Sequence, residues 1–295
     1  MNRFPGFATR VIVMLAGMSL PAAAQSSTAT RAPMIDAHAH YSQADAEALS
    51  PGAVLARLDA AGVSRLVVTS SPPELAQRLY RHAPQRVIPL LGVYDSDANK
   101  RDWMHDPALP ARVEARLAQG RWAGIGELHL FAADANSPVF EQLVRLAQTN
   151  RLVLMLHGDE EVVNRAFELA PQLRVLWAHL GTQPDPQRLA RMLERYPDRL
   201  WIDTSVRDER IAPEGRLLPG WHALFERHPD RFVVAVDTFS LNRWQHYEVV
   251  VDQIRTWLGP LSAELQVRLL HDNAAQLFAP FLRQSPAAAT ARPAP

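Results

Sequence analysis

The amino-acid sequence predicts an α/β fold, a (β/α)8 TIM barrel with extra C-terminal helices. Three observations lead to this prediction. Short apolar segments alternate with longer amphipathic segments eight times over about 225 residues, close to the length of one such barrel. The apolar segments are continuous rather than alternating, as expected for strands buried on both faces of a parallel sheet. No change of composition marks a second domain.

The expected elements follow one another as strand and then helix, the βαβ pattern of a parallel sheet. The strands are expected at residues 34–38, 65–70, 87–93, 123–128, 152–157, 174–179, 200–204 and 231–237. The helices are expected at residues 45–61, 74–82, 108–119, 138–149, 160–170, 186–196, 220–227 and 244–258. Residues 262–282 are expected to add one or two C-terminal helices.

The N-terminus predicts a secretory signal peptide over residues 1–24. Two arginines flank its start, an apolar run covers residues 11–20, and three alanines end at Ala24. The run is too short to span a bilayer, which needs about 20 residues. We expect cleavage after Ala24 and a periplasmic or secreted protein; an uncleaved anchor and a cytosolic extension are the alternatives. Residues 25–33 are then expected to form a linker, residues 34–283 the barrel, and the Ala/Pro-rich residues 284–295 a disordered tail.

The composition excludes several classes of function. The 31 basic and 31 acidic side chains balance, which gives no electrostatic footprint for nucleic acid. The absence of cysteine excludes a disulfide framework, a thiol nucleophile and an iron–sulfur cluster. We therefore expect a small-molecule substrate as partner, with no nucleic acid and no stable membrane anchor. A homo-oligomer is possible.

Histidines and carboxylates stand where the expected strands end. In a barrel of this class, active-site residues lie at the carboxyl ends of the strands and in the loops that follow. The residues at these ends are His38, His40, Glu127, His129, His157, His179 and Asp237. Taken singly, each of these residues can be explained without a catalytic role. A strand-end histidine is usually a core residue, and Asp237 could cap a helix. Their joint occurrence on separate strands is far more specific.

These side chains predict a divalent metal cofactor. His38 and His40 lie two residues apart on an extended segment, so both imidazoles point to the same side and can bind one ion. His157, His179 and Asp237 converge on the same axis from other strands. Imidazole and carboxylate ligands suit Zn²⁺, whereas Ca²⁺ prefers mostly oxygen. We expect one or two ions per chain, with zinc as the first candidate.

The order of these motifs resembles that of the amidohydrolase superfamily, in particular its amidohydrolase-related (amidohydrolase 2) branch of metal-dependent hydrolases. The resemblance covers essentially the whole mature chain. The segments that carry it are IDAHAH (35–40), GIGE (124–127), LHG (156–158), AHLG (178–181), VDT (236–238) and DNAAQLF (272–278). These motifs point to the superfamily and leave the substrate open.

The resemblance implies a role for each motif residue. His38, His40 and Asp237 would ligate a first metal, and His157 is a ligand in most members. His179 would either ligate a second metal or polarise the substrate. Glu127 would bridge two metals, as the corresponding carboxylate does in TatD-like deoxyribonucleases, because no lysine stands there to be carbamylated. In single-metal decarboxylases the bridge is missing, and Glu127 would then be a buried supporting or ion-paired residue.

The leading expectation is an exported metal-dependent hydrolase that uses a metal-activated water to cleave a small ester, lactone, amide or phosphoester. Asp237 would act as general acid–base, and His179 would help stabilise charge on the attacked oxygen. The alternatives are a single-metal decarboxylase of an unsaturated or aromatic carboxylic acid and a catalytically silent envelope binding protein. Two metal ions per chain would favour the hydrolase, whereas one ion would leave both the hydrolase and the decarboxylase open. Arg207 and Arg243 could bind a substrate carboxylate or form surface ion pairs.

Overall fold

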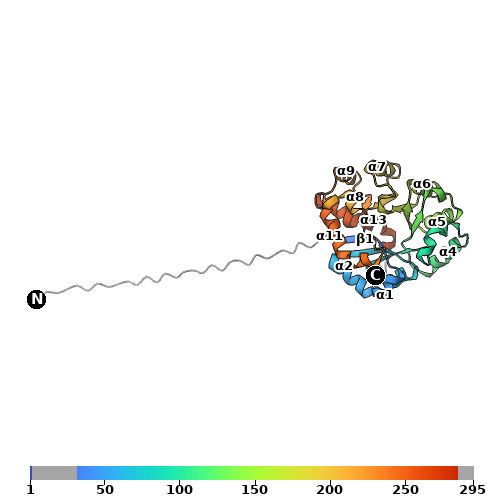
Figure 1. Cartoon of the computed structure of the whole chain (residues 1–295), viewed down its shortest axis with the longest axis horizontal. Helices are drawn as coiled ribbons and strands as arrows, with labels where there is room; N and C mark the ends of the chain where they lie inside the picture. Colours follow the sequence, from blue (N-terminus) through green and yellow to red (C-terminus); the bar gives the residue numbers. More distant parts are fainter. Residues whose placement is uncertain (2–31, 285–295) are drawn as a thin grey trace, which may run out of the picture. The chain divides into compact units, whose positions relative to one another are not determined.

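The computed structural model describes Met1 and residues 32–284. Eight strands form one parallel sheet in the order of the sequence, from β1 to β8 (Figure 1). The strands are β1 (Met34–His40), β2 (Val63–Thr69), β3 (Val87–Leu91), β4 (Gly124–Leu130), β5 (Val153–Gly158), β6 (Arg174–Trp177), β7 (Leu200–Asp203) and β8 (Phe232–Val233). The predicted (β/α)8 barrel is confirmed.

Backbone hydrogen bonds close the sheet between its first strand and the segment after its last. Ala37 N donates to Val234 O at 3.2 Å, and Asp237 N donates to His38 O at 2.8 Å. This closure brings the end of β1 beside residues 234–237. The carboxyl ends of the strands therefore surround one barrel mouth, which is where this fold class builds its active sites.

Helices surround the strands as a ring, and α2, α5, α7, α9 and α11 lie around β1 in Figure 1. The helices are α1 (Gln43–Ala48), α2 (Pro51–Ala61), α3 (Glu74–His82), α4 (Leu109–Gln119), α5 (Pro138–Thr149), α6 (Glu160–Leu169), α7 (Pro186–Arg195), α8 (Asp208–Ile211), α9 (Pro219–Arg227), α10 (Leu241–Gln245), α11 (Tyr247–Leu258), α12 (Ala263–Val267), α13 (Asn273–Leu277) and α14 (Ala279–Arg283). Short 3-10 turns are η1 (Asp97–Arg101), η2 (Trp103–His105), η3 (Ala132–Asp134), η4 (Ala178–Leu180) and η5 (Pro213–Gly215), and η6 (Arg268–Asp272) is a π-helical turn.

Two predicted helices are in fact broken. The segment expected as one helix over 45–61 forms α1 and α2, because Ser50 is extended and caps α2, whose first residue is Pro51. Proline favours this first position and disfavours a helical residue before it. The segment expected over 244–258 likewise divides into α10 and α11 at His246. The short helix α8 was not predicted.

The predicted sixth and eighth strands are too long. β6 ends at Trp177 rather than at residue 179, because His179 has φ 60° and Leu180 φ 57°, in the left-handed region that no strand contains. β8 covers only Phe232–Val233, and the amide of Val234 donates to Leu269 O in η6 instead of to a neighbouring strand. His179 and Asp237 therefore belong to the loops that follow these strands.

The predicted signal peptide and most of the predicted linker lie outside the described residues, as does the tail from residue 285 onward. Within residues 32–284, no helix is both long and apolar enough to cross a lipid bilayer.

Candidate metal centre

The two histidines of β1 point into the barrel mouth together. Their Nε2 atoms lie 3.1 Å apart, which agrees with the expected alternation of side chains along the strand. His38 is 1% exposed, and its other ring nitrogen, Nδ1, lies 3.1 Å from Asp203 Oδ2 on β7. The contact with Asp203 therefore orients the buried ring of His38, and the Nε2 atom faces the barrel mouth.

Glu127 on β4 lies between the histidines of β1 and those of the later strands. Its Oε2 atom is 3.3 Å from His40 Nε2. Its Oε1 atom is 2.9 Å from His157 Nδ1 and 3.1 Å from His179 Nε2. The side chain is 3% exposed, so the two carboxylate oxygens face two different groups of imidazoles inside the protein.

Two loop residues complete the cluster, and both have left-handed backbones. His179, at φ 60°, is fixed by its own amide, which donates to Asp203 Oδ1 at 3.0 Å. Asp237, at φ 55°, is fixed by the hydrogen bond that its backbone amide donates to His38 O. The Oδ1 atom of Asp237 is buried and has no hydrogen-bond partner among the described residues, although His40 Nε2 lies 3.3 Å away. A buried unpaired carboxylate oxygen is costly unless a cation satisfies it.

The six candidate ligands form two groups that share Glu127. The first contains His38 Nε2, His40 Nε2, Asp237 Oδ1 and Glu127 Oε2, in which neighbouring nitrogen and oxygen atoms lie 3.3 to 3.8 Å apart. The second contains His157 Nδ1, His179 Nε2 and Glu127 Oε1. A tetrahedral zinc ion with bonds of about 2.0–2.1 Å needs ligand atoms about 3.3 Å apart. Both groups therefore fit a divalent ion, and the donor set of imidazoles and carboxylates suits zinc.

The pKa values of His38 and Glu127 are shifted in opposite directions. Burial alone would lower the pKa of His38, but Asp237, Glu127 and Asp203 outweigh it and raise that pKa well above its usual value. Burial alone would raise the pKa of Glu127, but His38 and the bonds from His157 and His179 hold it well below its usual range. The cluster therefore favours bound positive charge, which protons or metal ions can supply.

Sequence reasoning missed the role of Asp203. This residue ends β7 and is fully buried behind the cluster. It contacts the His38 ring, the His179 amide and the Ser205 hydroxyl, and Ser205 Oγ lies 2.8 Å from His179 Nδ1. A carboxylate at the end of an expected strand was a usable signal, but its partners come from distant strands and could not be read from spacing.

His129 lies at the edge of the cluster. Its ring stacks on His157 with centroids 4.3 Å apart, and its Nε2 atom is 3.6 Å from Glu127 Oε2. Its backbone amide donates to the Tyr94 hydroxyl at 2.7 Å, and that hydroxyl also lies 3.3 Å from His129 Nδ1. Burial lowers the pKa of His129 to about 3. The structure therefore presents a neutral imidazole beside the Glu127 carboxylate.

The two arginines that we considered as substrate ligands support the ligand loops. Arg207 Nε donates to His179 O at 3.1 Å. Arg243 donates from Nη2 to Val236 O and from Nε to Asp237 O, the latter at 3.4 Å. Each thus holds the backbone beside a candidate ligand. These contacts use part of each guanidinium, and both arginines are partly exposed.

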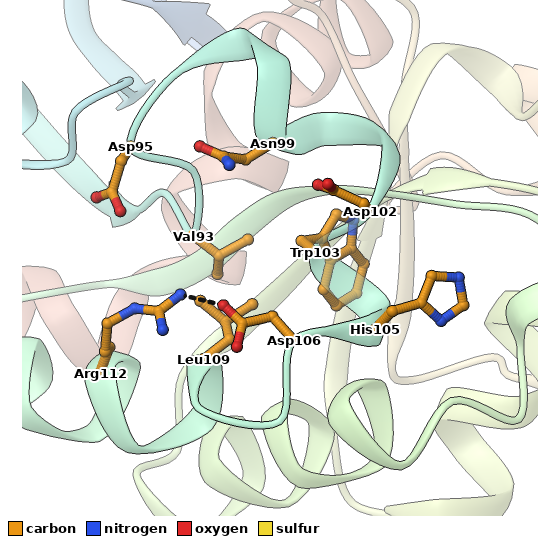
Figure 2. A pocket seen from close by; sticks show the side chains of 9 residues that line it. All are labelled: Val93, Asp95, Asn99, Asp102, Trp103, His105, Asp106, Leu109 and Arg112. Carbon is orange, nitrogen blue, oxygen red and sulfur yellow. Dashed lines mark hydrogen bonds and ion pairs between the residues drawn. The ribbon is translucent and has the colours of Figure 1, made fainter.

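A separate pocket of about 260 Å³ lies between the end of β3 and α4. Figure 2 shows its acidic lining, in which Asp106 is paired with Arg112. Asp95, at the same pocket, pairs with Arg116. None of the six candidate ligands lines this pocket, and its carboxylates Asp95 and Asp106 already have cationic partners, so it does not resemble the cluster at the barrel mouth.

Comparisons with known proteins agree with this architecture. A sequence model of a protein family described as amidohydrolase matches residues 35–279. No curated protein matches the chain significantly.

Several solved structures share the fold. An amidohydrolase from Burkholderia multivorans with bound zinc has a TM-score of 0.54 and 15% identity, over 84% of this chain and 99% of that one. A probable 2-pyrone-4,6-dicarboxylic acid hydrolase from Acinetobacter baumannii with citric acid bound has a TM-score of 0.54 and 16% identity, over 83% and 99%. An amidohydrolase from Mycoplasma synoviae has a TM-score of 0.57 and 12% identity, over 83% and 87%.

Proposed function

We propose that this chain adds water to a small ester, lactone, amide or phosphoester at a centre of two divalent ions. The premise is that the chain belongs to the amidohydrolase family, in its amidohydrolase 2 branch, and is a metal-dependent hydrolase. The observation that carries this proposal is the position of Glu127. Its two carboxylate oxygens face two separate groups of ligand atoms, as a bridging ligand must. Zinc is the first candidate for both ions.

The residues have distinct tasks in this proposal. His38, His40 and Asp237 would hold the first ion, His157 and His179 the second, and Glu127 both. Bound divalent ions would lower the pKa of a coordinated water toward about 7 and polarise the substrate. Asp237 would accept a proton from the attacking water and pass it to the leaving group through Oδ2, which lies 3.8 Å from His179 Nε2, because Oδ1 is the atom that would bind the first ion.

Lactones bearing carboxylates are the first substrates to test. The name of the Acinetobacter neighbour refers to a pyrone dicarboxylic acid, although a likeness at 16% identity establishes only the shared fold. Independent support comes from Arg207 and Arg243, which lie beside the loops that carry His179 and Asp237. A guanidinium at this place can bind a carboxylate of the substrate.

We also propose that the protein is exported and acts in the periplasm or outside the cell. The support is the sequence of residues 1–24, with its basic start, short apolar run and alanines before the expected cleavage point.

Elemental analysis of the purified protein, followed by an activity screen, tests the proposed function. We expect two divalent ions per chain and hydrolysis of at least one lactone, ester, amide or phosphoester after addition of Zn²⁺ or Mn²⁺. The double variant His40→Ala/His157→Ala removes one ligand from each group and measures the background from contaminating hydrolases. One ion per chain together with release of CO2 from an unsaturated acid would contradict the proposal and favour a decarboxylase.

A further inference from the structure

Asp203 is a fully buried carboxylate at the end of β7 that the proposed mechanism does not use. Its Oδ2 atom lies 3.1 Å from His38 Nδ1. Its Oδ1 atom accepts from the His179 amide at 3.0 Å, the Ser205 amide at 3.0 Å and the Ser205 hydroxyl at 2.5 Å. One carboxylate therefore reaches both groups of candidate ligands.

The contact with His38 determines which nitrogen of that ring carries a proton. The Oδ1 atom of Asp203 already accepts three hydrogen bonds, which favours the ionised carboxylate, and an ionised carboxylate can only accept. His38 Nδ1 must therefore donate the proton. In a neutral imidazole, Nε2 then carries a lone pair, and it faces His40 and Glu127. A metal ligand needs that lone pair.

The contact with His179 has the same consequence, by way of Ser205. The Ser205 hydroxyl has a single hydrogen, and it donates that hydrogen to Asp203 Oδ1. Toward His179 Nδ1, at 2.8 Å, the serine oxygen must then accept. His179 Nδ1 therefore carries the proton, and Nε2 faces Glu127 Oε1 with its lone pair when the ring is neutral.

We propose that Asp203 is a positioning residue that fixes the tautomer of one ligand in each metal group, His38 directly and His179 through Ser205. This inference rests on the proposed two-metal function. It makes the first metal position depend on the Oδ2 atom of Asp203 and the second position on the Oδ1 atom, so that one side chain presents both Nε2 atoms to metal. Partners of this kind behind a ligand commonly change metal affinity by about 10- to 100-fold.

Two substitutions test the link to His38 and the link to His179 separately. In Asp203→Asn, the amide oxygen must remain toward the amides of His179 and Ser205, since an NH2 group cannot accept from them. The NH2 group then faces His38 Nδ1, which becomes an acceptor and moves the ring proton to Nε2. The first metal position should weaken about 10- to 100-fold while the second is retained. Ser205→Ala should do the reverse, because it removes only the partner of His179.

Titration of the metal-free full chain with Zn²⁺, in competition with a chromogenic chelator, measures both affinities. His40→Ala and His157→Ala identify which step belongs to which position. Thr204→Val is the matched control, because Thr204 is buried between the two residues and its hydroxyl has no hydrogen-bond partner among the described residues. We expect this control to bind both ions as the wild type does.

Histidine ¹⁵N NMR supplies a readout that a purely structural role would not change. In the metal-free wild type, above the pH at which both imidazoles lose their second proton, His38 and His179 should carry the proton on Nδ1. Asp203→Asn should move it to Nε2 in His38 alone. Should Asp203→Asn destabilise the fold, Ser205→Ala tests the link to His179 by itself.

The outcomes separate this inference from the proposed function. Unchanged affinities and tautomers in both variants would overturn the inference. Equal weakening of both positions by each variant would also overturn it, because that result indicates a general packing defect. A wild type that binds fewer than two ions would contradict the two-metal function, and the NMR tautomers would still decide the role of Asp203.

Discussion

At the scale of single residues, chemically similar side chains differ in what surrounds them. Asp203 accepts several hydrogen bonds and is locked in place, whereas Asp237 Oδ1 lacks a hydrogen-bond partner among the described residues. Glu127 differs again, because it contacts imidazoles through both oxygens. In the proposed centre the unsatisfied Oδ1 of Asp237 binds the first ion and Oδ2 remains to handle a proton, which is why we assign the acid–base role to Asp237.

Replacing Asp237 by asparagine should therefore remove turnover and leave part of the metal binding. Asparagine keeps one oxygen for the first ion but cannot accept the proton of the attacking water. We expect kcat to fall by about 10²- to 10⁴-fold for the best substrate of the screen, measured with zinc-loaded protein. Asp95→Asn is the matched control, because Asp95 pairs with Arg116 away from the cluster. Wild-type turnover in Asp237→Asn would show that the acid–base assignment is wrong.

His129 should matter for turnover without binding metal. The Tyr94 hydroxyl accepts from the His129 amide, so its own hydrogen is available to His129 Nδ1, and Nε2–H is left to donate into the mouth. His129→Phe keeps a ring against His157 and removes this donor. We expect about 10²-fold lower kcat at unchanged zinc content. His105→Phe, at an exposed histidine in η2, controls for surface effects. Loss of zinc in His129→Phe would instead make His129 a ligand.

How much of the site could be predicted from the sequence depends on what each residue contacts. His38 and His40 could be predicted to point together, because the period of a strand fixes their relative direction. Their convergence with His157, His179 and Asp237 followed from the fold class, which gathers strand ends at one mouth. The link from Asp203 through Ser205 to His179 could not be predicted, because it depends on the exact turn after β6.

At the scale of elements, that turn is the feature that the sequence pattern misrepresented. The apolar residues 175–178 continue without a break into His179, so the sequence predicted a longer strand. In the structure β6 stops at Trp177, and His179, Leu180 and Gly181 all have positive φ. The turn lifts the His179 ring toward Glu127 and places its amide on Asp203. Local backbone geometry, rather than strand periodicity, therefore positions this ligand.

Gly181 is the residue that makes the turn possible. It has φ +72°, and a Cβ there would lie 2.5 Å from Cζ2 of the buried Trp177. Gly181→Ala should therefore cost about 1–3 kcal/mol of unfolding free energy, measured by urea unfolding of zinc-free protein, and should weaken the second metal position. Gly220→Ala in α9 is the control, because its Cβ would meet nothing closer than Pro186 Cγ at 3.6 Å. Equal stabilities of the two variants would contradict this account of the turn.

At the scale of the whole molecule, the ligands come from parts of the chain that are far apart. They lie on β1, β4 and β5 and in the loops after β6 and β8, with Asp203 on β7 behind them. The barrel itself closes through the backbone bonds between β1 and residues 234–237. Ions at the mouth would therefore tie the first strand, the middle of the sheet and the last loop to one another.

Export should leave a recognisable N-terminus on the mature chain. We expect mass spectrometry of protein recovered from the periplasm or medium of a bacterial host to show a chain beginning at Gln25. Replacing Ala22 and Ala24 by leucine removes the small residues before the cleavage point and should leave the precursor uncut. A full-length wild-type chain confined to the cytoplasm would contradict export without affecting the proposed chemistry.

Metal removal should destabilise the entire barrel rather than one loop. Ions that bind only the folded chain add RT ln(1 + [L]/Kd) to its stability, which is about 4 kcal/mol at a thousandfold excess over Kd. We expect dialysis against a chelator to lower the urea midpoint in one cooperative transition, and added Zn²⁺ to restore it. In His40→Ala/His157→Ala the difference between chelated and zinc-treated protein should largely disappear. A wild-type midpoint that does not respond to metal would mean that the cluster at the mouth is satisfied without ions, and the proposed hydrolytic centre would fail with it.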